Sequence, residues 1–176
     1  MTRIRSDIAF TPTVKAIQTA KGSRANYARM ESGRGWQAEV TPDLAAFIAD
    51  LDMFYLGTAN AAGQPYIQYR GGPRGFLKVV DTRTLGFADF GGNRQYISTG
   101  NLSDNQQAFI FLIDYVNSRR IKLWGTARVI EDDAALLADL ADASYAGRPE
   151  RAILFTIEAW DVNCPQHIHK RVRVDE

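Results

Sequence analysis

Four residues near the middle of the chain have the types and spacing that suit a phosphate group. Gly91, Gly92, Asn93 and Arg94 follow an apolar stretch, and a helix is expected to start near Asn93. Glycines let a ligand approach the backbone, a helix N-terminus offers unpaired N–H groups, and arginine adds a bidentate charged donor. The segment predicts a phosphate cradle, although a Gly-Gly turn beside a surface arginine explains the same residues equally well.

Two further cations could reach this segment. Lys78 lies on the strand expected before it, and Arg120 starts a strand that has one polar face. Three cations at strand ends around one helix N-terminus would hold a phosphomonoester well. Taken singly, each of them is more often a solvated surface charge.

Three more side chains could contact a planar ligand. Gln68 and Arg70 are two residues apart on an expected strand, so they share one face and could contact the polar edge of a heterocycle. The same spacing also fits a plain exposed strand face. Trp124 could stack on a ring or, as we slightly favour, close a dimer interface.

The common catalytic signatures are missing from the sequence. It contains no G-x-S-x-G, no Walker loop, no H-E-x-x-H, no C-x-x-C and no G-x-G-x-x-G after a strand. With two histidines and one cysteine, a metal site of the zinc type is not expected. We therefore assign no catalytic residue from motifs.

The elements that must position these residues alternate between helical and strand periods. Thr41 is a suitable N-cap before a helix with one apolar face, formed by Leu44, Phe47, Ile48 and Leu51. A later helix carries Leu136, Leu137 and Leu140. Strands are predicted at residues 53–59, 64–70, 76–80, 84–88, 107–115, 120–130 and 153–159. Six or seven mostly antiparallel strands with flanking helices predict a small β-barrel of the α+β class.

Length and composition limit the class of protein. The chain has 176 residues, of which 45% are hydrophobic and 23% charged, and one of them is a cysteine. These values suit one globular domain in a reducing compartment, so we expect a cytoplasmic protein. The longest apolar runs are six residues, whereas a membrane-spanning helix needs about 20. We expect residues 41–176 to form the domain, preceded by an irregular arm, 1–40, with one short helix around 13–19.

Charge is distributed unevenly along the chain. Residues 1–36 hold seven Lys and Arg against two Asp and Glu, a balance of +5, although the whole chain carries +1. A basic arm can contact nucleic acid. We do not favour a contact between the arm and nucleic acid. We expect the arm to be solvated and to pack on a partner surface.

Six segments of the chain occur in an order that is typical of one family. They are FYLGTA (54–59), GQPY (63–66), YRGGPRGFLK (69–78), LGFADFGGNR (85–94), STGNL (98–102) and RIKLWGTAR (120–128). In this order they resemble the pyridoxamine 5′-phosphate oxidase-like FMN-binding split barrels. The tail NCPQHI (163–168) is similar to one uncharacterised subgroup. The resemblance implies a split barrel that forms a homodimer, with FMN in clefts at the subunit interface.

The resemblance also implies which residues bind the cofactor. The matching positions are Lys78, Ala88, Asp89, Asn93, Arg94 and Arg120. Lys78 and Arg94 would hold the phosphate beside Asn93, which replaces a serine. Ala88 and Asp89 take the place of a pair that touches the flavin, and Arg120 replaces a glutamine.

The chain departs from the true oxidase at three further places. Its phosphate loop reads Arg94-Gln95 instead of Arg-Lys, and a proline occupies the position of another family arginine, which Arg74 or Arg70 could replace. The C-terminal Arg-x-His of the oxidase is missing. Gln166 and His167 stand there as candidates for a substrate-side lid, in which the histidine is either a proton donor or plain surface. We expect little activity on pyridoxamine 5′-phosphate.

The function that these observations favour is an FMN-dependent oxidoreductase acting on a small molecule or on NAD(P)H. A flavin-binding, storage or sensor protein without turnover is the alternative, because the same fold serves both classes. Heme handling and use of a deazaflavin also remain open.

Overall fold

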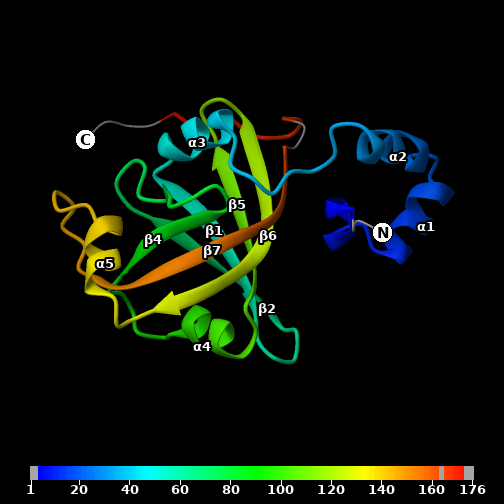
Figure 1. Ribbon diagram of the computed structural model, residues 1–176. Helices are drawn as coiled ribbons and strands as arrows, with labels where there is room; N and C mark the ends of the chain where they lie inside the picture. The colour runs from blue at the N-terminus through cyan, green and yellow to red at the C-terminus, as the bar shows by residue number, and fades with distance from the viewer. Residues whose placement is uncertain (1–3, 163–164, 173–176) are drawn as a thin grey trace.

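The computed structural model describes residues 4–162 and 165–172 (Figure 1). The helices are η1 (Arg5–Ile8, a 3-10 helix), α1 (Pro12–Ala20), α2 (Arg24–Ser32), α3 (Pro42–Ala49), α4 (Ile97–Asp104) and α5 (Ala134–Leu140). The strands are β1 (Met53–Ala59), β2 (Pro65–Gly71), β3 (Lys78–Val79), β4 (Thr84–Phe90), β5 (Gln107–Asp114), β6 (Arg119–Ile130) and β7 (Pro149–Val162). None of the helices in these residues is long and apolar enough to cross a membrane.

The strands form one antiparallel sheet in the order β2-β1-β5-β6-β7-β4-β3. The sequence predicted six or seven mostly antiparallel strands and the α+β class, and the seven-stranded sheet confirms both predictions. The sheet curls until Arg70 of the edge strand β2 forms an ion pair with Asp89 of β4, two strands that share no ladder. Figure 1 shows α3 and α4 at opposite ends of the curled sheet and α5 beside β4.

The core lies inside the curled sheet because alternate residues of its strands are apolar. Along β1 and β6 every second side chain is buried, including Phe54, Leu56 and Leu123. At one end of the sheet α3 adds Leu44 and Phe47 to this core. The Thr41 hydroxyl caps α3 as predicted, accepting a hydrogen bond from the Leu44 N–H at 3.2 Å.

The N-terminal arm is more ordered than we predicted. It contains η1, α1 and α2 instead of one short helix in an irregular segment. Phe10 packs on Tyr27 and Trp36, with ring centroids 5.1 and 5.0 Å apart. Glu31 accepts a hydrogen bond from the Ser6 hydroxyl and pairs with Arg24. Weak apolar periodicity hid these helices, because polar contacts between them replace part of an apolar core.

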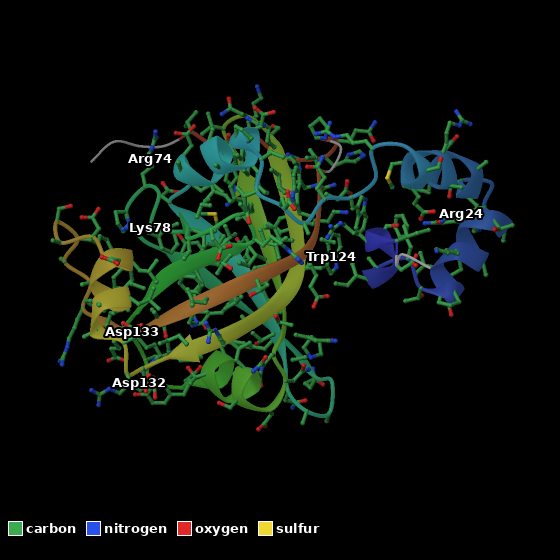
Figure 2. The ribbon with its side chains drawn as sticks, in the orientation of Figure 1. Arg24, Arg74, Lys78, Trp124, Asp132 and Asp133 are labelled. Carbon is green, nitrogen blue, oxygen red and sulfur yellow. The ribbon has the colours of Figure 1, made fainter. Side chains whose placement is uncertain are left out.

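The arm also changes the role of Trp124. Trp36 stacks on this ring at 4.6 Å between centroids and 16° between planes, and Phe109 meets its other side edge-on. Figure 2 shows Trp124 on the side of the barrel that faces the arm. The chain's own arm covers Trp124, so the dimer interface that we slightly favoured is not needed to explain it.

Candidate functional site

A cavity of about 230 Å³ opens between β2, the end of β4, the start of α4 and the first residues of β7. Its lining is polar and charged, in contrast to the apolar core. The residues around it are Tyr66, Gln68, Arg70, Asp89, Phe90, Gly92, Asn93, Arg94, Gln95, Tyr96, Ile97, Ser98, Thr99, Glu150 and Arg151. Guanidinium, hydroxyl and amide donors predominate, and they suit an anionic ligand.

An ion-pair network forms one wall of this cavity. Asp89 is 6% exposed and pairs with Arg70 and, at 3.2 Å, with Arg151 Nη1. Burial lowers the pKa of Arg151, but attraction to Asp89, Glu150 and Glu131 outweighs that effect, so the pKa is raised. Arg151 therefore stays charged. The Nε of Arg70 is buried and has no hydrogen-bond acceptor among the described residues.

The loop 91–96 forms the opposite wall and has a strained backbone. Arg94 and Tyr96 adopt left-handed conformations, with φ of 59° and 53°. Such values are uncommon for residues with a side chain and recur at ligand-binding sites. A Cβ at Gly92 would meet nothing within 4 Å, so the space beside this backbone is open. In the described part of the chain, no ion pair or hydrogen bond engages the Arg94 guanidinium.

The first turn of α4 closes the cavity on a third side. The helix begins at Ile97, three residues after Arg94, so our prediction of a helix starting near Asn93 was wrong. The left-handed Tyr96 delays the start. The Ser98 hydroxyl donates to Gln68 Oε1 at 2.7 Å, and the Asn101 amide donates to Thr58 Oγ1 at 3.0 Å. These two bonds hold the helix N-terminus, with its unpaired N–H groups, against the cavity.

The structure gathers about half of the predicted site residues. Gln68, Arg70, Asp89, Asn93 and Arg94 come from two strands and a loop and line the same cavity. Gln68 and Arg70 share a face of β2, as the spacing of two residues predicted. Their contact with a cofactor stays a prediction.

Two of the three cations that we expected to converge lie elsewhere in the chain. Lys78 Nζ donates to the Asp139 carbonyl of α5 at 2.6 Å, because its short strand β3 is the sheet edge beside that helix (Figure 2). Arg120 lies on β6 opposite Ile113 and does not line the cavity. The prediction that three cations meet at the loop is therefore wrong for a single chain.

The remaining predicted residues also lie away from the cavity. Arg74 pairs with Asp50 at 3.5 Å near α3 (Figure 2). Ala88 is buried against α5. Gln166 and His167 belong to a segment whose Ile168 carbonyl accepts a hydrogen bond from Ser118, in the β5–β6 hairpin, at 3.4 Å. That hairpin is at the far end of β6 and β7 from Arg151, so no lid forms over this cavity within one chain.

Sequence reasoning missed Tyr96, Ser98, Glu150 and Arg151. The last strand was predicted to begin at residue 153, because the residues before it show no apolar alternation. One signal was present: Asp89 sits in an otherwise apolar strand, and a buried carboxylate requires a cationic partner. Arg151 lies directly opposite it in the β4–β7 ladder.

A family model described as pyridoxamine 5′-phosphate oxidase matches residues 40–164. The chain belongs to this family. The match covers the barrel and the cavity and begins at the last residue of the N-terminal arm. The resemblance seen in the sequence is thereby confirmed. No curated protein matches this chain at a significant level.

Several solved structures share this fold. HupZ from Group A Streptococcus has 19% identity and a TM-score of 0.57, over 76% of this chain and 99% of that one. An FMN-binding protein from Syntrophomonas wolfei has 14% identity and a TM-score of 0.55, over 83% of this chain and 97% of that one. A protein from Clostridium acetobutylicum that is related to general stress protein 26 has 16% identity and a TM-score of 0.51, over 67% of this chain and 83% of that one. At these identities, the likeness concerns the fold alone.

Proposed function

We propose that this protein binds FMN with its phosphate in the cavity beside the loop 91–96 and acts as an FMN-dependent oxidoreductase on a small molecule. The observation that carries the proposal is Arg94. Its guanidinium has no partner among the described residues, its backbone is strained, and the residue lines a cavity rich in donors. Membership of the pyridoxamine 5′-phosphate oxidase family supports a flavin ligand.

The residues present fit a phosphate group. Arg94 supplies a charged fork, the space at Gly92 lets the ligand approach the backbone, and the first turn of α4 supplies N–H groups. Arg70 Nε is a further buried donor without an acceptor in the described part of the chain.

The other cavity residues would position the rest of the ligand. Gln68 is fixed by the Ser98 hydroxyl, and Arg70 by Asp89, so both present oriented polar groups without a large entropy cost. Bound flavin supplies the hydride chemistry, and the protein contributes orientation and tuning.

The first test is a flavin titration of the purified protein. We expect a yellow protein, or one that becomes yellow on adding FMN, with one flavin bound per chain. Quenching of flavin fluorescence measures the stoichiometry. If the flavin fluorescence is not quenched at any ratio of protein to FMN, the proposal is wrong. Bleaching of the bound flavin by NADH or NADPH under anaerobic conditions would then distinguish an oxidoreductase from a storage protein.

We also propose a homodimer, because one chain does not enclose the ligand. Pockets for drug-sized molecules usually measure about 300–1,000 Å³, and this cavity measures about 230 Å³. A second copy would supply the missing wall, and in that arrangement Lys78, Arg120 or the segment with His167 could come from the partner. Light scattering should give about twice 19.6 kDa. A monomer mass at micromolar concentration, with FMN bound, would contradict the dimer.

A further inference from the structure

Glu150 occupies an unusual place in the β4–β7 ladder. Asp89 pairs with Arg151, but the next residue, Phe90, pairs with Pro149. Glu150 is therefore the extra residue of a β-bulge. In a regular strand two successive side chains point to opposite faces, whereas a bulge redirects one of them. This is why Glu150 and Arg151 both line the cavity.

The bulge brings the Glu150 carboxylate against the proposed phosphate loop. Its Oε1 lies 2.8 Å from the position that a Cβ on Gly91 would occupy. Its Oε2 accepts a hydrogen bond from Arg151 Nη2 at 2.8 Å. A fixed negative charge thus lies beside the backbone where the ligand's anion would bind.

Arg151 does not cancel this negative charge. It also pairs with Asp89 and Glu131, so three carboxylates share its single positive charge. Arg70 adds one positive charge through Asp89. The three carboxylates and two guanidinium groups of this network together carry a formal charge of −1. Of the arginines that line the cavity, Arg94 therefore remains to pair with a ligand.

We propose that Glu150 is a specificity-determining residue, which limits the ligand to one phosphate by repelling further negative charge. The inference rests on the proposed function, because it concerns the same cavity. Arg94 and the α4 N-terminus attract a first phosphate, and the adjacent carboxylate opposes a second one. Like charges placed face to face are a common means of rejecting wrong ligands.

The test compares E150Q with the wild type by titration with FMN, riboflavin, inorganic phosphate and inorganic pyrophosphate. Glutamine keeps the shape and a hydrogen-bond acceptor for Arg151 but removes the charge. We expect FMN to bind about fivefold more tightly to E150Q and riboflavin, which has no phosphate, to bind equally to both proteins. Protection against thermal unfolding measures the binding of the two inorganic anions. The affinity for pyrophosphate should rise more from the wild type to E150Q than the affinity for phosphate.

E158Q is the matched control. Glu158 lies on β7 like Glu150, and its replacement removes the same charge, but it is exposed and does not line the cavity. We expect E158Q to leave all four affinities at the wild-type level. If E158Q reproduces the effect of E150Q, or if E150Q weakens FMN binding or tightens riboflavin equally, the proposal is wrong.

The two phosphate probes separate this inference from the proposed function. If the wild type binds no flavin, the flavin proposal fails, and the comparison of phosphate with pyrophosphate still decides on Glu150. A larger gain for pyrophosphate in E150Q supports the inference without flavin. If phosphate and pyrophosphate each protect E150Q no better than they protect the wild type, the inference is overturned.

Discussion

Replacing Arg94 with alanine should weaken FMN binding about thirtyfold. A charge-assisted hydrogen bond to an anion contributes about 2 kcal/mol, and this free energy corresponds to that change in the dissociation constant. The effect should be large because, in the described part of the chain, no carboxylate pairs with Arg94 and competes for its guanidinium. Fluorescence titration of FMN against both proteins measures it.

Riboflavin distinguishes a phosphate contact from a general loss of structure. It lacks the phosphate, so R94A should bind it as the wild type does. R128A is the matched protein control, because Arg128 is exposed on β6 and outside the cavity while the change in net charge is the same. Should FMN and riboflavin lose affinity equally in R94A, the phosphate binds elsewhere.

Replacing Gly125 with alanine should lower the free energy of unfolding by about 3 kcal/mol, the upper end of what overpacking costs. Gly125 follows a register shift between β6 and β7, where the two backbones come very close. A Cβ there would lie 2.0 Å from the Thr156 carbonyl oxygen and 3.0 Å from the Phe155 ring. A backbone oxygen in a sheet cannot rotate away, so the two central strands of the barrel must separate.

Gly100→Ala is the control for this prediction. Gly100 lies in α4, and a Cβ there would meet nothing within 4 Å. Alanine favours a helix over glycine by about 1 kcal/mol, so G100A should unfold at the same urea concentration or at a slightly higher one. A G125A midpoint equal to the wild-type value would mean that the strands accommodate the methyl group.

The sequence by itself determined most of the strands, helix α3 and the family. Apolar alternation along residues 120–130 and 53–59 predicted two strands almost to the residue, because their buried faces follow the backbone period of two. The Thr41 cap and the apolar face that follows it predicted α3. These signals are local, so they need no knowledge of the strand order. The segments that carried the family resemblance depend in the same way on residue order alone.

The composition of the site was decided by the tertiary structure. Arg70 and Asp89 meet because the whole sheet curls, and no local pattern encodes that curvature. A one-residue bulge turns Glu150 into the cavity, and strand periodicity alone would have assigned it to the other face. Lys78 reached α5 instead of the loop because β3 became the sheet edge. Strand order, curvature and bulges arise from contacts between distant parts of the chain, so which charges share a cavity is known only once the barrel has formed.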